Sequence, residues 1–371
     1  MGAFTIVYGF ALFAMTFFSY GFVDANFPFI PFRALFNLAH TNFAGLTIIY
    51  SSLICILFAL YVFLLSLLKK GRVKEGEIWK LILITIGILI FSFPGISNDI
   101  FNYIATAKVT FFYHENPYII MPIEIPNEPL LAFMHAANKI ALYGPTWIVL
   151  TGIPHFLGFG NLYLTIFTFK LFAVLFYVAL LRLIWHASNK NLWALTFFAL
   201  NPLVITETMI SGHNDVVMMF FALASFMLLQ KKKILFSIVS LVVSILIKYA
   251  TILLLPIYII ILFLTLTKSK IVWENIWYWS SLAMFIAFLL SPIREEIYAW
   301  YFIWPLTFVA LLKDNPFLKT ISLGFSFGLM FRVVPFLATG SWVGITPFVK
   351  KIVTFTPPAI LTIFYALKKK I

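Results

Sequence analysis

Long apolar runs, separated by short polar segments, recur along most of this chain of 371 residues. A helix that crosses the hydrocarbon core of a bilayer needs about 20 predominantly apolar residues, so such runs predict transmembrane helices. The pattern predicts an all-α polytopic membrane protein with about twelve spans, at residues 3–23, 43–68, 78–97, 161–186, 192–210, 215–230, 233–248, 250–267, 273–291, 297–312, 318–337 and 352–367.

The composition strengthens this prediction. Apolar residues make up 63% of the chain, charged residues make up only 11%, and the mean hydropathy is +1.02. Soluble proteins carry about 25% charged residues and cannot hide so much apolar surface from water. Disordered chains combine low hydrophobicity with high charge, so that class is excluded as well. The one cysteine, Cys55, rules out a disulfide within the chain.

The basic residues are distributed unevenly between the two sides of the predicted membrane domain. Seventeen of the 26 Lys and Arg fall on the side of the two termini when the chain crosses twelve times. Because cytoplasmic loops are enriched in Lys and Arg, we expect both termini in the cytoplasm and the protein in the plasma membrane. The net charge of +13 then reflects these loops, and no nucleic-acid partner is expected.

Residues 98–160 form the one sizeable segment outside the predicted spans, on the extracytoplasmic side. Their prolines and aromatic residues predict short surface helices rather than a flexible linker. Residues 144–160 are apolar, but a span there would reverse the orientation of everything that follows, so we expect a re-entrant or surface-lying piece. No P-loop or GxGxxG motif is present, and residues 1–371 are expected to form a single membrane domain with 98–160 as a loop within it.

Polar and ionisable residues gather at the outer ends of the predicted spans, although they lie far apart in the sequence. In so apolar a chain they are candidates for function. Each also has a structural explanation. Asp99 could cap a helix, Pro202 could kink one, and Lys248 could extend its amine to the interface. His213 and Asp215 could simply be turn residues. Their joint placement on one surface favours a functional site.

The chemistry of these groups suits a lipid substrate that carries a phosphate. Lys248, Arg294 and Arg332 lie near the outer ends of spans, where cations could hold the phosphate while apolar helices accommodate the lipid chain. Asp99 could accept a proton from an attacking hydroxyl group. The sequence therefore predicts a site for group transfer at the membrane surface.

A divalent metal stays open at this stage. Asp99, Glu207, His213 and Asp215 offer oxygen and nitrogen ligands. No closely spaced ligand motif identifies a metal site, so the signal is weak.

An ordered set of motifs resembles the GT-C superfamily of polytopic glycosyltransferases, and within it the bacterial polyprenol-phosphate-mannose-dependent mannosyltransferases. The motifs are Asp99 with Tyr103, Glu115-Asn116-Pro117-Tyr118, Tyr143-Gly144-Pro145-Thr146-Trp147, Asn201-Pro202-Leu203 with Glu207, Gly212-His213-Asn214-Asp215, Lys248-Tyr249, and Trp300-Tyr301 with Trp304. The resemblance implies an extracytoplasmic catalytic loop with an essential acid at the position of Asp99. We expect substrate contacts from Asn98, Tyr103, Asn116, Tyr118, Tyr143, Trp147, Glu207, His213, Asn214, Asp215, Tyr301 and Trp304.

The resemblance implies an inverting transfer of a hexose, expected to be mannose, from a polyprenyl-phosphate donor to an extracytoplasmic glycan or lipid acceptor. Asn98 stands where many relatives carry a second acid, so a second carboxylate stays unassigned and metal dependence stays open. The alternative is a secondary transporter or lipid flippase, with ionisable residues near the bilayer midplane. Only Lys170 lies deep within a predicted span, which favours the enzyme.

Overall fold

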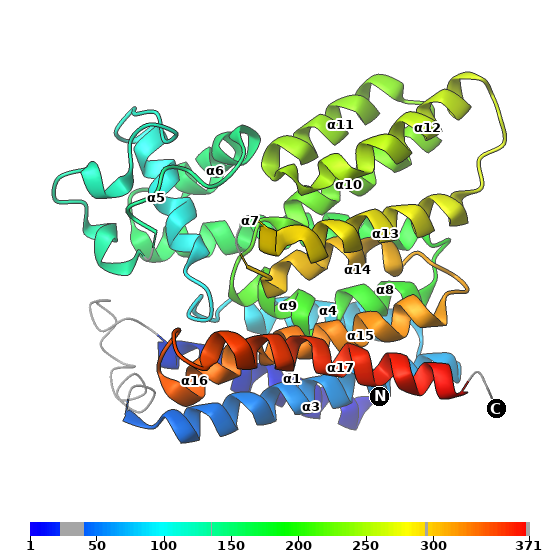
Figure 1. The fold of residues 1–371 in the computed structure, drawn as a ribbon, viewed down its shortest axis with the longest axis horizontal. Coiled ribbons are helices and arrows are strands. Elements are labelled where there is room, and N and C mark those ends of the chain that lie inside the picture. The colour runs from blue at the N-terminus through cyan, green and yellow to red at the C-terminus, as the bar shows by residue number, and fades with distance from the viewer. Residues whose placement is uncertain (23–40, 135, 294–295, 369–371) are drawn as a thin grey trace.

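The computed structural model describes residues 1–22, 41–134, 136–293 and 296–368, and all regular structure within these ranges is helical. Most helices run roughly along one direction (Figure 1). They are α1 (Gly2–Ser19), α3 (Phe43–Lys69), α4 (Glu75–Leu89), α5 (Asp99–Phe111), α6 (Pro145–Leu157), α7 (Leu162–Ala187), α8 (Leu192–Ala199), α9 (Pro202–Ile205), α10 (Asp215–Gln230), α11 (Ile234–Ile247), α12 (Leu255–Leu266), α13 (Trp273–Leu290), α14 (Ile303–Val309), α15 (Pro316–Met330), α16 (Val334–Thr339) and α17 (Thr346–Lys368).

The helices confirm a membrane protein, but they do not confirm twelve spans. Among the described residues, six helices are long and apolar enough to cross a membrane, or seven if α8 and α9 form one bent span. Other apolar runs are helical over a shorter length. Helix α11 has 14 residues and α4 has 15, which cover only about 21–23 Å of a hydrocarbon core of about 30 Å.

The break between α8 and α9 lies at Asn201-Pro202, as expected. The chain bends there by 52°, because proline lacks an amide hydrogen and clashes with the preceding turn. Asn201 caps the new helix, with its Oδ1 accepting a hydrogen bond from the Leu203 amide at 3.0 Å. A π-helical turn, η5 (Thr206–Ile210), follows directly. Such turns are frequent at functional sites.

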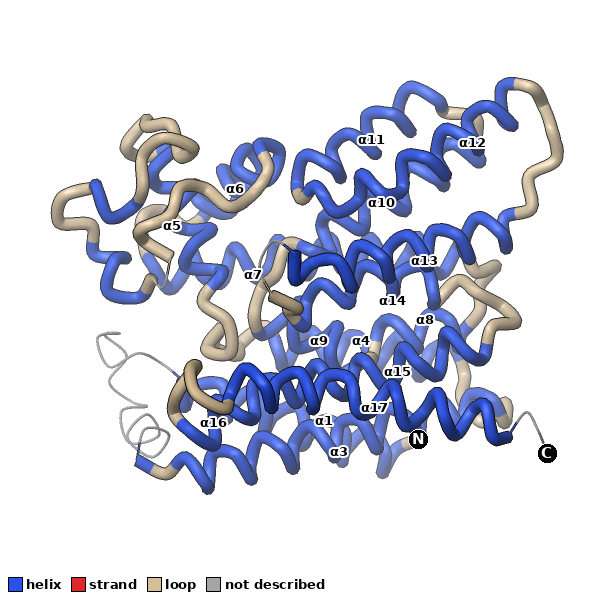
Figure 2. Tube along the Cα trace, in the orientation of Figure 1, coloured by secondary structure: helices blue, strands red, loops and turns tan. Residues whose placement is uncertain are grey.

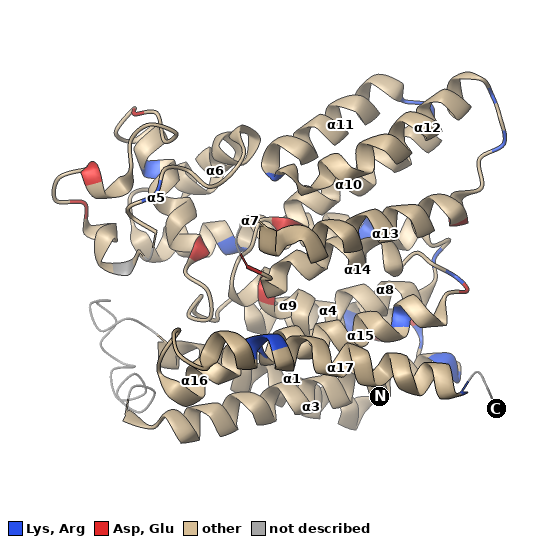
Figure 3. Ribbon diagram, in the orientation of Figure 1, with Lys and Arg blue, Asp and Glu red and all other residues tan. Residues whose placement is uncertain are grey.

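Lys and Arg residues lie mainly toward one end of the helices, at the right of Figure 3. Helix α3 ends there at Lys69, and α17 at Lys368. Helix α1 begins toward the same end (Figure 1). This arrangement agrees with the uneven distribution of basic loops along the sequence. That this end faces the cytoplasm remains a prediction from the positive-inside rule.

Residues 98–160 form a lobe at the left of Figure 2, made of α5, α6 and two short 3-10 turns, η3 (Pro122–Glu124) and η4 (Pro129–Phe133). Helix α6 packs against α5, α7 and α11. The Gly144 amide donates a hydrogen bond to the Ile247 carbonyl at 3.1 Å. A Cβ atom at Gly144 would overlap the Leu246 carbonyl oxygen, so this close approach requires glycine. The expected short helices are present, and they are docked on the bundle.

Lys170, the charge deep within α7, ties the end of α4 to the bundle. Its amine donates hydrogen bonds to the carbonyl oxygens of Leu89 at 3.2 Å and Ile90 at 2.8 Å, and to both oxygens of Ser92. The last carbonyls of a helix have no partner within the helix. Lys170 supplies one here, and so fixes the start of the linker that carries Asp99.

Candidate active site

Side chains from several segments that are distant in the sequence meet in one cluster. The segments are the start of α5, the turn η5 with residues 211–215 that follow it directly and include the first residue of α10, the end of α11, and the pair formed by η8 (Ala299–Phe302) and α14. The bend at Pro202 and the short α4 and α11 bring these ends together. We call these side chains the acidic cluster: Asp99, Glu207, His213, Asp215, Lys248, Trp300, Tyr301 and Trp304.

His213 lies between two carboxylates. Its Nδ1 is 3.6 Å from Oδ2 of Asp99, and its Nε2 is 3.2 Å from Oε2 of Glu207. The imidazole stacks on Trp300, with ring centroids 3.9 Å apart. The Asp99 side chain is 27% exposed, whereas those of His213 and Glu207 are buried. Of the two carboxylates beside His213, that of Asp99 is accessible and that of Glu207 is buried, so Asp99 is the one that can meet a substrate.

Asp215 forms the second half of the acidic cluster, at the first residue of α10. Lys248 donates to its two carboxylate oxygens at 2.9 and 3.1 Å, and Trp304 Nε1 donates to Oδ1 at 2.6 Å. The Lys248 amine also lies 4.7 Å from the centroid of the Tyr301 ring, which stacks on Trp304. Cation–π contact and the ion pair together hold this ammonium group in place.

Buried polar atoms without a hydrogen-bond partner concentrate beside the acidic cluster. An unsatisfied buried polar group costs about 1–3 kcal/mol, and native proteins contain few of them. Their concentration around the π-helical turn indicates a place for ordered water or a polar ligand. Between residues 206 and 214 they belong to Thr206, Glu207, Thr208, Ser211, His213 and Asn214.

An aromatic wall backs the cluster on the side of the lobe. Tyr103 meets Tyr143 and Trp147 edge-on, with ring centroids 4.7 and 5.0 Å apart. The Tyr103 hydroxyl accepts a hydrogen bond from the Asn214 amide at 3.4 Å. The Tyr118 hydroxyl donates to the Tyr143 carbonyl at 2.8 Å. These predicted residues are brought together, and the wall connects the lobe to the turn that carries His213.

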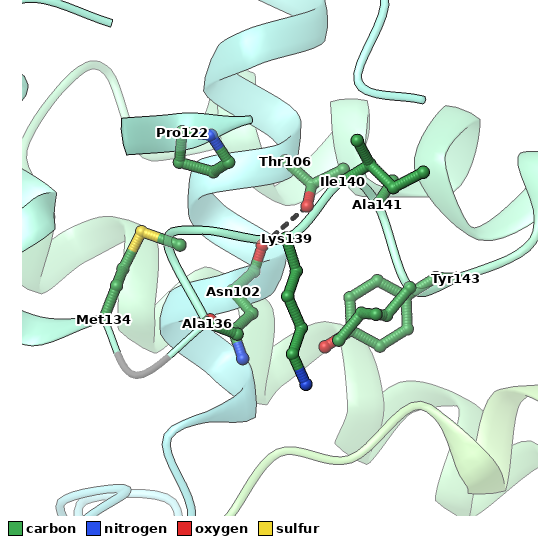
Figure 4. Close-up of a pocket in the computed structure, with 10 residues that line it drawn as sticks. Asn102, Thr106, Pro122, Met134, Ala136, Lys139, Ile140, Ala141 and Tyr143 are labelled. Carbon is green, nitrogen blue, oxygen red and sulfur yellow. Dashed lines mark hydrogen bonds between the residues drawn. The ribbon is translucent and has the colours of Figure 1, made fainter. Parts of the chain in front are cut away.

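A small cavity lies along α5 beyond the aromatic wall (Figure 4). Its volume of about 10 Å³ is close to the minimum that one water molecule needs. Asn102, one helical turn after Asp99, lines it with Lys139 and Tyr143. The buried Oδ1 of Asn102 has no protein partner. The cavity is too small for a sugar. It suits a structural water, which would satisfy this oxygen.

The remaining predicted residues lie elsewhere. Asn98 precedes α5, and its carbonyl accepts hydrogen bonds from the first turn of that helix. Asn116 accepts a hydrogen bond from the Tyr118 amide at 3.0 Å, within the lobe. Arg332 forms an ion pair with Glu296 and donates to Thr354 Oγ1 at 3.1 Å.

The expected convergence of the three cations is therefore not seen in the described part of the chain. Arg294 lies outside the described residues. Lys350, which the sequence had not singled out, shares Glu296 with Arg332 and lies 4.9 Å from the Trp342 ring centroid. Glu296 thus pairs with a cation of α17 and with one in the 3-10 turn that follows α15.

The structure adds two residues to those that the sequence predicts for the site. Trp300, part of the aromatic motif that precedes Trp304, stacks directly on His213. Lys170, the charge within a predicted span, anchors the linker before Asp99. No group of three or more His, Cys, Asp and Glu side chains suited to a metal occurs among the described residues.

Comparison with known proteins identifies the family. A family model described as alpha-(1→6)-mannopyranosyltransferase, N-terminal domain, matches residues 5–264. This region includes the lobe, Asp99, the 206–215 segment and Lys248, and it covers more than half of the chain. No curated protein and no solved structure matches the chain. The match confirms the resemblance to mannosyltransferases drawn from the motifs, and the chain belongs to the alpha-(1→6)-mannopyranosyltransferase family.

Proposed function

We propose that this protein transfers a mannosyl group from a polyprenyl-phosphate donor to a glycan or glycolipid acceptor on the extracytoplasmic side of the plasma membrane. The family match supports the mannosyl transfer. The observation that carries the mechanism is the position of Asp99, a partly exposed carboxylate backed by His213 at the edge of a buried polar cluster.

Asp99 acts as the general base. Its outer oxygen accepts the proton of the acceptor hydroxyl, and the freed oxygen attacks the anomeric carbon. Asp99 is the first residue of α5, where the helix dipole favours a negative charge. His213 lies behind this carboxylate, with its Nδ1 3.6 Å from Oδ2. A positioned base of this kind contributes about 10²–10⁴-fold to the rate.

Lys248 binds the donor phosphate. Its side chain is 20% exposed, whereas that of its partner Asp215 is fully buried. The ammonium group is therefore fixed from the inside and open on its outer side. It carries three N–H donors, and a phosphate oxygen can use one that does not point to Asp215. The charge that develops on the leaving phosphate is stabilised there, so no general acid is needed.

The reaction is a single displacement. The anomeric carbon gains positive character in the transition state, as in glycoside hydrolysis. The acceptor approaches from the side of Asp99 and the phosphate leaves on the opposite side, so the configuration inverts. The apolar spans accommodate the polyprenyl chain.

The deciding experiment is transfer from synthetic polyprenyl-phosphate mannose by the purified protein in detergent, with Asp99→Asn beside wild type. We expect transfer with inversion by wild type and loss of turnover in the variant. A protein that instead moves the lipid across vesicles without forming product would support the transporter alternative.

A further inference from the structure

The lobe of residues 98–160 holds a hollow that this mechanism does not use. Its volume is about 430 Å³, within the range of about 300–1,000 Å³ of many ligand pockets. It is far larger than the water-sized cavity beside Asn102 and can hold a sugar ring. The end of α5, the turn that follows it and the start of α6 form its walls, including Thr110, His114, Glu115, Asn116, Tyr118 and Val149.

The lining is largely apolar, with Pro117, Pro145 and Ile148 beside an aromatic ring, and a few hydrogen-bonding groups lie at its edge. Tyr118 is 39% exposed and Val149 is 68% exposed, and the Glu115 side chain is exposed on the same turn. The C–H face of a pyranose packs on an aromatic ring, while its hydroxyl groups donate to a carboxylate. This combination of groups is suited to a neutral sugar.

The wall of the hollow is built in a fixed shape. His114 has a φ of 57°, a left-handed conformation that costs energy in a residue other than glycine and recurs at ligand sites. The Glu115 amide donates to the Val109 carbonyl at 2.9 Å. Asn116 Oδ1 holds the Tyr118 amide at 3.0 Å. The turn is thus preformed before any ligand arrives.

The position of the hollow relative to Asp99 limits what it can bind. Thr110 follows Asp99 by eleven residues on the same helix, a separation of about 16 Å along the axis. One hexose ring is too short to reach both. Contacts of the aromatic wall connect the hollow with the helix that carries Asp99. The Tyr118 hydroxyl donates a hydrogen bond to the Tyr143 carbonyl, and Tyr143 packs on Tyr103.

We propose that the hollow binds a sugar residue of the acceptor several units away from the hydroxyl group that receives mannose. The proposal rests on the transferase function, and it assigns a second acceptor subsite to the lobe, apart from the site at Asp99. The sugar ring packs on Tyr118. The Glu115 carboxylate accepts hydrogen bonds from its hydroxyl groups, and the side-chain NH2 of Asn116 donates one to them.

The test compares acceptors of increasing length, from methyl mannoside to linear alpha-(1→6)-linked mannose oligosaccharides, using the full chain. The acceptor KM should fall about tenfold once the chain reaches the hollow. Glu115→Ala, and Val149→Trp to fill the hollow, should return the KM for long acceptors to that for the single sugar. Glu124→Ala, an exposed glutamate of the same lobe that does not line the hollow, is the matched control and should behave as wild type.

Binding of a long oligosaccharide without donor, followed by saturation-transfer NMR, provides a readout that needs no turnover. It should be lost in Glu115→Ala and kept in Glu124→Ala. A KM that is independent of length, equal effects of the variants on short and long acceptors, or an effect on the donor KM instead would each overturn the proposal. Failure of the transferase function would show differently, as oligosaccharide binding without any transfer by wild type.

Discussion

The Lys248 amine lies 2.9 Å from Oδ1 of Asp215, and this contact joins the end of α11 to the start of α10. Asp215 is completely buried, so its charge depends on this ammonium group and on the indole N–H of Trp304. Lys248 therefore has a structural partner inside the protein and an accessible side facing outward. A test of phosphate binding by Lys248 must therefore separate the loss of the phosphate contact from the loss of the ion pair with Asp215.

A double variant separates these roles. Lys248→Ala alone leaves a buried carboxylate unpaired, which costs about 3–5 kcal/mol, so it should lower the melting temperature as well as activity. Lys248→Met combined with Asp215→Asn removes both charges, and the amide oxygen can still accept from Trp304. We expect this protein to melt close to wild type and to show a raised donor KM with an unchanged acceptor KM. A normal donor KM in the stable double variant would place the phosphate elsewhere.

Asp99→Asn should lower kcat by about 10²–10⁴-fold without changing the fold. The amide keeps the shape of the side chain and an oxygen for His213, and it removes only the basic oxygen. Asp314→Asn, at an exposed aspartate between α14 and α15, is the control and should turn over normally. The measurement is single-turnover transfer at saturating donor, together with thermal unfolding. Near-normal turnover in Asp99→Asn would show that another group takes the proton.

Lys170→Met should destabilise the protein and displace the linker that leads to Asp99. The substitution removes the donor for three buried carbonyl groups, at Leu89, Ile90 and Ser92, at a cost of about 1–3 kcal/mol for each group left unsatisfied. We expect a clearly lower melting temperature in differential scanning fluorimetry. Lys268→Met, in an exposed loop, should melt like wild type. Equal melting temperatures would mean that water replaces the amine at no cost.

The attachment of η4 to the lobe should depend on pH through Glu128. Burial alone would raise the pKa of Glu128, but hydrogen bonds from Lys108, Tyr113 and the Leu130 amide, with the Lys108 charge, bring it below its ordinary value of 4.5. The hydrogen bond that the Tyr113 hydroxyl donates to Glu128 raises the pKa of this hydroxyl to about 12. A carboxyl whose pKa is lowered by folding stabilises the folded state above its unfolded pKa, and this contribution is lost as the pH falls through the folded value.

Hydrogen exchange at the amides of Leu130 and Leu131, corrected for intrinsic rates, should therefore show protection at pH 7 that declines below about pH 4.5. In Glu128→Gln the protection at pH 7 should be weaker and should no longer vary with pH in this range. Protection in wild type that rises on acidification would contradict the sign of the pKa change.

The sequence determined the class of protein, the positions of the helices and the identity of the chemical groups. Apolar runs of this length favour helices in a bilayer, and helices form within the predicted spans, although six or seven of them among the described residues are long enough to cross a membrane. The break at Pro202 follows from the missing amide hydrogen of proline. Local motifs also identified Asp99, His213, Asp215 and Lys248, because polar residues at the ends of apolar runs are costly without a function.

Tertiary structure alone decided which of these groups meet. Hydropathy measures how apolar a run is, but it does not show where the helix within that run begins and ends, as at α4 and α11. Ion pairing depends on distances in space, and no pattern within the chain indicates that Lys248 would meet Asp215, or that Arg332 would instead meet Glu296. The stacking of Trp300 on His213 and the anchoring role of Lys170 arise in the same way. Each joins segments far apart in the sequence, and only the packing of the helices brings their side chains within reach.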